Sequence, residues 1–144
     1  MEKSRPNSPT NGNVAKRPRL QVHVTGPARR DIAAIVEWSF QEFGEAAALR
    51  YEALIFQALL DLAADPERPG SRERPEIMIE GARTYHLAYS RTRVKGESVK
   101  TPRHFLLYRR AGERVIEVGR ILHDARGLMR HLPEEYRRIA TPLL

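Results

Sequence analysis

The sequence of 144 residues contains no cysteine and only one tryptophan. The lack of cysteine excludes disulfide bonds, a thiolate nucleophile and cysteine-rich zinc sites. Long apolar runs are also missing, because the most apolar stretch, residues 46–64, is interrupted by Arg50, Glu52 and Asp61. The first thirty residues lack the apolar segment of a secretion signal. We therefore expect a cytoplasmic protein without a membrane partner.

Acidic residues are in deficit, since 18 Asp and Glu stand against 25 Lys and Arg, for a net charge of +7. This excess is unevenly spread: residues 1–20 carry +4, residues 28–69 carry −4 and residues 70–144 carry +7. The N-terminal segment is rich in Pro, Gly, Asn and Ser, so we expect residues 1–19 to be a disordered basic tail. Residues 20–144 should form a single domain with an acidic first half and a basic second half.

The domain is predicted to begin with a strand and a helix. Residues 20–24 (LQVHV) alternate apolar and polar side chains, which is typical of a half-buried strand. Residues 25–27 (TGP) favour a helix start, because proline is tolerated in the first turn. Apolar side chains then recur at spacings of three and four until Gly44, which should end the helix. This stripe, expected in the core, comprises Ile32, Ile35, Val36, Phe40 and Phe43.

A second helix is predicted over residues 45–64, and Pro66 prevents its continuation. Because the joint between the two helices is so short, they should fold back on each other as a hairpin. The apolar stripe expected on the second helix comprises Leu49, Ala53, Phe56, Leu59, Leu60 and Ala63.

The second half of the domain has the two-residue period of strands. The three predicted strands are residues 83–90, 104–109 and 114–122. A tight turn at residues 111–113 makes them an antiparallel meander. Residues 65–81 are predicted to be a loop, and Asp124 is expected to cap a short C-terminal helix. The order of elements indicates an α+β fold with one sheet and both helices on one of its faces.

Several of these segments match a known pattern when they are read in order. The second half contains GARTYHL from residue 81, RHFLLYRR from residue 103 and VIEVGRILHDARGLMRHLP from residue 115. The first half contains ARRDIAAIVEWSFQEFG and then AAALRYEALIFQALLDLAADPERPG. Together, over about residues 20–135, they resemble the RelE/ParE superfamily of bacterial toxins, and most closely its ParE branch. The shared features are an Asp-bearing first helix, a Gly joint and a second helix that ends in Leu-Ala-x-x-Pro.

The resemblance implies the same fold and the toxin of a type II toxin–antitoxin pair, which a cognate antitoxin neutralises. ParE-like toxins poison DNA gyrase and have no catalytic site, whereas RelE-like toxins are ribosome-dependent mRNA endoribonucleases. We expect the ParE-like activity and keep the endoribonuclease as the alternative. No cofactor is expected, and contact with nucleic acid should be indirect or weak. The five histidines contain no H-x-x-x-H pair, so we expect no metal site either.

An endoribonuclease would need cations around the scissile phosphate and a group that transfers protons. The catalytic candidates in that case are Arg83, Arg103, Arg120 and His123. Two basic positions of the RelE-like pattern are apolar here: Phe105 stands at the first, and Ile121 and Leu122 follow Arg120. This departure favours the ParE-like interpretation.

The resemblance implies that gyrase is contacted by the C-terminal region, residues 123–136. The candidate target-binding residues are Arg120, His123, Arg126, Arg130 and His131. Alternatively, His123 and His131 are structural residues at the ends of secondary-structure elements. The antitoxin is expected along the helical hairpin, where acidic residues would complement a basic helix. The candidate antitoxin-binding residues are Glu37, Trp38, Glu42, Glu45, Glu52 and Asp61, with Trp38 alternatively at the edge of the core.

Overall fold

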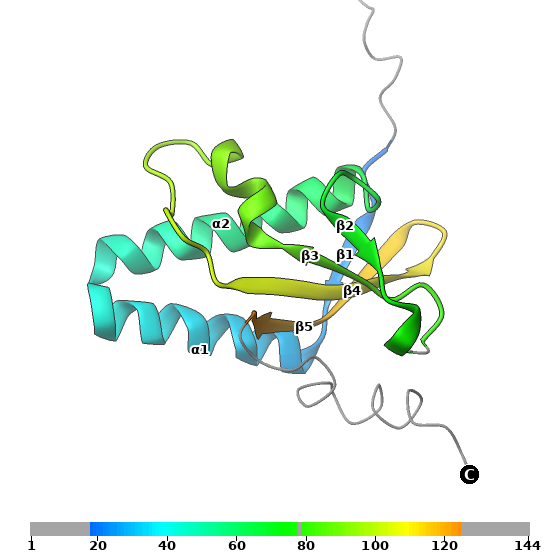
Figure 1. Cartoon of the computed structure of the whole chain (residues 1–144), viewed down its shortest axis with the longest axis horizontal. Helices are drawn as coiled ribbons and strands as arrows, with labels where there is room; N and C mark the ends of the chain where they lie inside the picture. Colours follow the sequence, from blue (N-terminus) through cyan, green and yellow to red (C-terminus); the bar gives the residue numbers. More distant parts are fainter. Residues whose placement is uncertain (1–17, 78, 125–144) are drawn as a thin grey trace, which may run out of the picture.

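A computed structural model describes residues 18–77 and 79–124 of the chain. A strand is followed by two helices and then by four strands, with two short 3-10 helices among them (Figure 1). The predicted α+β class is therefore confirmed. Most of the predicted tail 1–19 and the predicted C-terminal helix lie outside the described residues. Neither helix of the described part is long and apolar enough to cross a membrane.

Both predicted helices are present and form the predicted hairpin. They are α1 (Gly26–Phe43) and α2 (Glu45–Ala64). The side-chain oxygen of Thr25 caps α1 by accepting the backbone N–H of Ala28 at 3.2 Å. Between the helices, Gly44 adopts a φ of +92°, which an L side chain rarely adopts, so the sharp reversal depends on glycine at this position.

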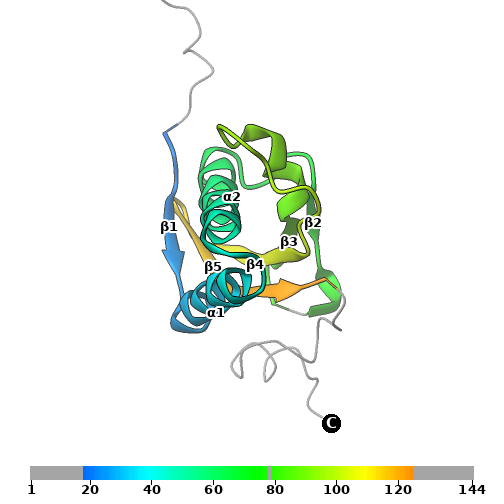
Figure 2. The same ribbon diagram turned by 90° about the vertical axis from the view of Figure 1, so that its left-hand side faces the viewer.

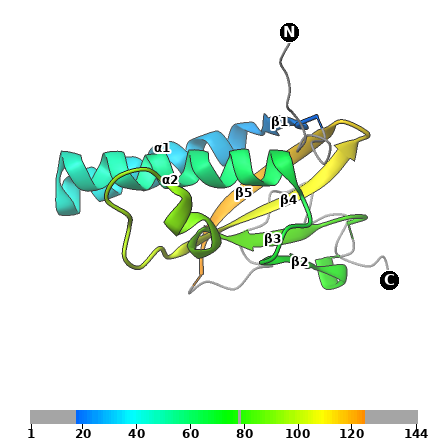
Figure 3. The same ribbon diagram turned by 90° about the horizontal axis from the view of Figure 1, so that it is seen from above.

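The five strands form one mixed sheet with the order β1-β5-β4-β3-β2 (Figure 3). They are β1 (Gln21–Val24), β2 (Ser71–Glu73), β3 (Arg83–His86), β4 (His104–Gly112) and β5 (Val115–His123). Neighbours are antiparallel except that β1 runs parallel to β5, with Gln21 opposite Val115. The predicted antiparallel meander holds for β3, β4 and β5, but the prediction did not include the edge strand β2 or the parallel pairing of β1 with β5. Alternation within residues 20–24 predicted a strand, but it carried no information about which strand would become its neighbour.

Two local segments also differ from the prediction. The strand expected over residues 83–90 stops at His86, because η2 (Leu87–Arg93) is a 3-10 helix. The ring Nδ1 of His86 caps this turn by accepting the backbone N–H of Ala88 at 3.0 Å. Within the expected loop 65–81 lie the edge strand β2 and the short 3-10 helix η1 (Pro75–Ile77). Both are three residues long, which is too short for a periodic pattern to reveal them.

The core lies between the sheet and the helical hairpin, and Figure 2 looks along the two helices. Both helices therefore pack on one face of the sheet, as predicted. The largest buried side chains of this core are Leu54, Ile55, Leu62, Tyr85, Leu106, Tyr108, Ile116 and Val118. A smaller cluster covers the opposite face, where Leu107 packs with Ile77, Ile79 and Ala82. Ile77, Ile79 and Ala82, from the connection between β2 and β3, thus cover part of the second face of the sheet.

Helix α2 is apolar on two sides, and only one of them is in the core. The buried side comprises Ala48, Leu54, Ile55, Ala58, Leu59, Leu62 and Ala63. Leu49, Phe56 and Leu60, which were predicted to be core residues, are 56%, 49% and 49% exposed. Together with exposed Ala53 they form a second row at spacings of four, three and four, which we call the outer stripe. Phe40 and Phe43 of α1 are exposed as well, so the predicted stripes were partly assigned to the wrong side.

Candidate functional site

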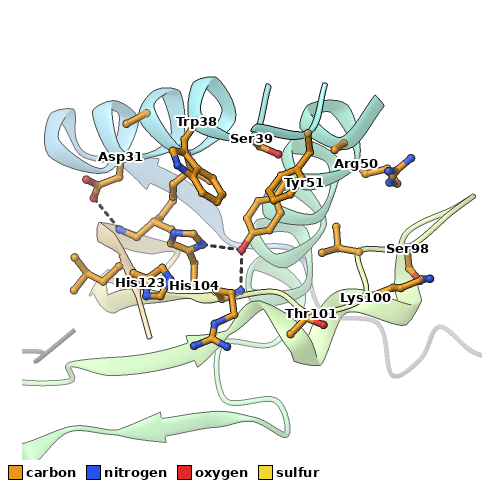
Figure 4. Close-up of a pocket in the computed structure, with 18 of the residues that line it drawn as sticks. Asp31, Trp38, Ser39, Arg50, Tyr51, Ser98, Lys100, Thr101, His104 and His123 are labelled. Atoms are coloured by element: carbon orange, nitrogen blue, oxygen red, sulfur yellow. Dashed lines mark hydrogen bonds between the residues drawn. The ribbon is translucent and has the colours of Figure 1, made fainter. Parts of the chain in front are cut away.

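The helical hairpin extends past the ends of the strands (Figure 1). A cleft of about 840 Å³ lies between the hairpin and the ends of β4 and β5. One wall is the inner side of α1 and of the first turns of α2, and the other is the connection before β4. The ends of β4 and β5 form the floor. The residues that carry its chemistry are Asp31, Trp38, Arg50, Tyr51, Lys100, Arg103, His104, Arg120 and His123 (Figure 4).

An ion pair between α1 and β5 closes one end of the cleft. Asp31 accepts two hydrogen bonds from the guanidinium of Arg120, at 2.6 Å from Nε and 3.0 Å from Nη2. The same carboxylate accepts the backbone N–H of Ile121 at 2.9 Å. Both side chains are mostly buried, with exposed fractions of 16% and 22%. This bidentate geometry fixes α1 against the sheet and orients the Arg120 side chain.

A tyrosine and a histidine are hydrogen-bonded on the floor. The hydroxyl of Tyr51 lies 2.7 Å from Nδ1 of His104 and accepts the backbone N–H of Arg103 at 3.0 Å. Burial raises the pKa of Tyr51 to about 12. Burial, followed by the positive charge that His123 can carry, lowers the pKa of His104 to about 4. At neutral pH the floor therefore consists of an uncharged phenol and an uncharged imidazole.

The His104 ring also contacts a second histidine. The rings of His104 and His123 meet edge to face, with centroids 5.2 Å apart. His123 Nδ1 lies 3.8 Å from the carboxylate of Asp124, which also contacts His86 at 2.9 Å and Arg103 at 3.1 Å. Burial acts to raise the pKa of Asp124, but the hydrogen bond from His86 and the charge of Arg103 hold it below its ordinary value. Asp124 is therefore ionised near neutral pH and joins the ends of β3, β4 and β5.

The mouth of the cleft combines an aromatic ring with cations. Trp38 is 56% exposed and meets Phe43 edge to face, with ring centroids 5.6 Å apart. Across the opening, Arg50 forms one ion pair of 3.3 Å, with the exposed Glu97. Lys100 is exposed and forms no ion pair with any of the described residues. Trp38 is thus at the entrance of the cleft rather than at the edge of the core.

The predicted catalytic residues are only partly brought together. Arg103, Arg120 and His123 line the cleft, whereas Arg83 does not. The Arg83 guanidinium donates to the Ser71 hydroxyl at 2.6 Å and pairs with Glu73 at 3.6 Å. Of the predicted target-binding residues, Arg120 and His123 are therefore in the cleft. The remaining three, Arg126, Arg130 and His131, lie outside the described residues.

The predicted antitoxin-binding residues fall into two groups. Glu37, Glu42 and Glu45 are exposed near the tip of the hairpin, and Glu52 is half-buried. Asp61, in contrast, is only 5% exposed. Its carboxylate accepts hydrogen bonds from Ser90 at 2.6 Å, Gln57 and Arg93 at 2.9 Å and Arg68 at 3.3 Å. This network ties α2 to η2, so Asp61 is not on a surface that a partner could contact.

Sequence reasoning did not select three of the residues that shape the cleft, namely Asp31, Tyr51 and Lys100. In the sequence Asp31 stands out only as part of the family pattern and Tyr51 not at all, and their partners Arg120 and His104 are 89 and 53 positions away in the chain. Lys100 lies in the basic connection before β4, but the sequence of that connection does not distinguish Lys100 from Lys95. Among the described residues no group of three His, Cys, Asp or Glu could hold a metal ion.

Comparison with known proteins agrees with this architecture. Residues 22–128 match the profile of a protein family described as the ParE toxin of the type II toxin–antitoxin system parDE. The chain belongs to the ParE toxin family. Since that family is part of the RelE/ParE superfamily, the resemblance seen in the sequence is confirmed. The match begins in β1 and includes every element that contributes to the cleft.

Chains from two solved toxin–antitoxin systems match this chain. A chain of the chromosomal ParDE toxin–antitoxin system from P. aeruginosa is 17% identical, with a TM-score of 0.52, and the match covers 74% of this chain and 98% of that one. A chain of the RelBE2 toxin–antitoxin complex from Mycobacterium tuberculosis is 21% identical with a TM-score of 0.45, and the match covers 75% and 94%. No curated protein sequence matches this chain. The likeness to the P. aeruginosa chain supports the fold.

Proposed function

We propose that this ParE-family protein inhibits growth by binding and poisoning DNA gyrase, and that a cognate antitoxin neutralises it by docking on α2. The observation that carries the antitoxin proposal is the outer stripe of Leu49, Ala53, Phe56 and Leu60. Such a continuous apolar row on an exposed helix is typical of a protein interface. Its spacing suits an amphipathic helix that lays its own apolar side chains across α2.

Charge around the outer stripe favours a basic partner. Glu45 is exposed in the first turn of α2, one turn before Leu49, and Glu52 lies half-buried beside the stripe. These carboxylates would attract Lys and Arg side chains at the rim of an interface whose centre is apolar. Added salt should therefore lower the affinity for the antitoxin, because it screens the charges at the rim while the apolar contact at the centre remains.

The antitoxin proposal is tested with the product of the adjacent reading frame. It should co-purify with the full chain, and Phe56→Glu should lower its affinity at least about tenfold, because a charge would be buried at the centre of the contact. Tyr89→Glu is the matched control, because Tyr89 is 54% exposed but lies on η2, off the stripe. Equal affinity for the wild type and Phe56→Glu would contradict docking on this stripe.

Family membership and the basic C-terminal half support the gyrase proposal. Arg120 and His123 lie at the end of β5, from which Arg126 and Arg130 follow in sequence. Purified protein at micromolar concentration should inhibit supercoiling by gyrase or trap cleaved DNA. Arg126→Glu combined with Arg130→Glu should relieve that effect, whereas Arg72→Glu, at an exposed position of β2, should not. Uninhibited supercoiling with no trapped DNA would reject the proposal.

The second candidate function is mRNA cleavage, and one observation favours it. His104 and His123 lie edge to face in a cleft that Arg103 and Arg120 also line, so imidazoles and cations are close together. If this is the activity, induced expression should cut transcripts in translating cells. His123→Ala should then abolish cleavage, and His23→Ala, at an exposed position of β1, should leave it intact. Intact transcripts with inhibited gyrase would decide against this candidate.

A further inference from the structure

We propose that the cleft between the helical hairpin and the β4–β5 ends binds a free nucleoside phosphate, with Trp38 stacking on the base and Lys100 and Arg50 contacting the phosphate. This inference is separate from the antitoxin surface. The cleft uses the side of α2 that carries Ala47, Arg50 and Tyr51, whereas the outer stripe uses Leu49, Ala53 and Phe56. Two faces of one helix are thus available to two different ligands.

The dimensions of the cleft suit a small molecule. Its volume of about 840 Å³ lies within the range of about 300–1,000 Å³ that is typical of small-ligand sites. Apolar walls from Ile35, Phe43 and Val99 alternate with polar groups, which is the composition of a pocket that orients its ligand. A purely apolar partner would leave these polar groups without hydrogen bonds, so a mixed ligand fits better.

The aromatic part of the ligand is indicated by Trp38. Its ring is 56% exposed at the mouth although the cleft beside it is lined by apolar groups. In Figure 4 the ring extends from α1 towards Tyr51 and the floor. An exposed indole beside cations is a stacking surface for a nucleobase. The edge contact with Phe43 holds the indole in place before the ligand arrives.

The anionic part is indicated by the charges that line the cleft. Four cations, Arg50, Lys100, Arg103 and Arg120, stand against two acids, Asp31 and Glu97. Asp31 is engaged by Arg120 at the far end, and Glu97, which is 74% exposed, pairs with Arg50 at 3.3 Å. Lys100 therefore has no charged partner among the described residues, and in Figure 4 both Lys100 and Arg50 lie at the end away from Asp31. A phosphate would be held there by charge-assisted hydrogen bonds.

The floor supplies hydrogen-bonding groups for the sugar and the base. Ser39, Thr101, Tyr51, His104 and His123 all line the cleft. Because Tyr51 and His104 already share a hydrogen bond, the floor is organised without the ligand. The uncharged Tyr51 and His104 on the floor and the cation Lys100 at the mouth would orient a nucleotide with its phosphate outward and its base inward.

The single tryptophan of the chain makes the test direct, since Trp38 accounts for all indole fluorescence. GMP and AMP should quench the emission of the full-length protein and saturate with a Kd of about 0.1–1 mM. Guanosine should bind about tenfold more weakly, and inorganic phosphate should neither quench nor compete at the same concentrations. If phosphate alone competes, the cleft is a general anion site and the proposal fails. It also fails if no nucleotide changes the emission.

Matched variants locate the ligand. Lys100→Ala should weaken GMP binding about tenfold, and Lys95→Ala, exposed on the same connection but outside the cleft, should leave it unchanged. With a fluorescent nucleotide as probe, Trp38→Ala should lose binding while Trp38→Phe retains most of it. Tyr89→Ala is the control for loss of an exposed aromatic ring. Equal effects of the Lys100 and Lys95 variants would overturn the assignment of the phosphate contact.

One further arm separates a free nucleotide from a nucleotide within a strand. A single-stranded tetranucleotide should bind no more than about threefold tighter than GMP, because only one base fits beside Trp38. Binding about a hundredfold tighter, with steep dependence on salt, would overturn the free nucleotide and assign the cleft to a nucleic acid strand.

Discussion

The carboxylate of Asp31 in α1 holds the guanidinium of Arg120 in β5 through two hydrogen bonds of 2.6 and 3.0 Å. This contact joins residues 89 positions apart and determines where α1 lies over the end of β5. Because α1 carries Trp38 and β5 carries His123, the same contact sets the width of the cleft. The first prediction concerns this pair.

Asp31→Asn should lower the free energy of unfolding by about 2 kcal/mol, because the mostly buried Arg120 would lose its charged acceptor. The measurement is urea unfolding at neutral pH. Glu97→Gln is the control, since the Arg50–Glu97 pair is exposed and should contribute less than about 0.5 kcal/mol. Equal losses of unfolding free energy in both variants would show that the Asp31–Arg120 contact stabilises the protein no more than an exposed ion pair does.

The depressed pKa of His104 predicts a pH-dependent stability. The unfolded chain takes up a proton near pH 6.5, whereas the folded chain does so only near pH 4. Stability from the neutral imidazole is therefore complete above pH 6.5 and falls by up to about 3 kcal/mol as pH drops to 4.

This prediction is checked by NMR titration of the His104 ring together with unfolding curves from pH 4 to 7. His104→Asn should flatten the pH dependence, and His23→Gln, at an exposed position of β1, is the control for removing a histidine. A His104 midpoint near 6.5 would refute the assignment.

The joint of the hairpin depends on the backbone of Gly44. Gly44→Ala should destabilise the protein by about 1–2 kcal/mol, because φ is +92° and nothing within 4 Å obstructs a Cβ, which leaves backbone strain as the only cost. Gly26→Ala is the matched control: this glycine is in the first turn of α1 without a positive φ, so alanine should be neutral or stabilising. Thermal or urea unfolding of both variants provides the comparison.

Substitutions on the two apolar sides of α2 should cost unequal amounts of stability. Ile55→Ala should cost about 2–5 kcal/mol in unfolding free energy, because Ile55 is fully buried in the core. Phe56→Ser should cost less than about 1 kcal/mol, because that ring is about half exposed. Urea unfolding of the isolated protein measures both, and a large loss for Phe56→Ser would mean that the outer stripe supports the fold rather than a partner.

Features that depend on residues close together in the chain, such as helix bounds and caps, were predictable from the sequence. The bounds of α2 and the roles of Thr25 and Gly44 follow from helix periodicity, capping preferences and the conformational freedom of glycine. The α+β class followed from the change of period along the chain, and membership of the ParE toxin family from an ordered set of segments.

Tertiary structure alone decided which side of α2 is buried, because both sides are apolar and a periodic pattern cannot rank them. It also decided that β1 pairs in parallel with β5, since strand pairing depends on contacts across almost the whole chain. The cleft belongs to the same class of feature: Asp31 with Arg120 and Tyr51 with His104 are pairs created by folding. The spacing of residues in the sequence predicts which side chains share a face of one helix or strand. Which elements then pack against each other depends on contacts throughout the folded domain.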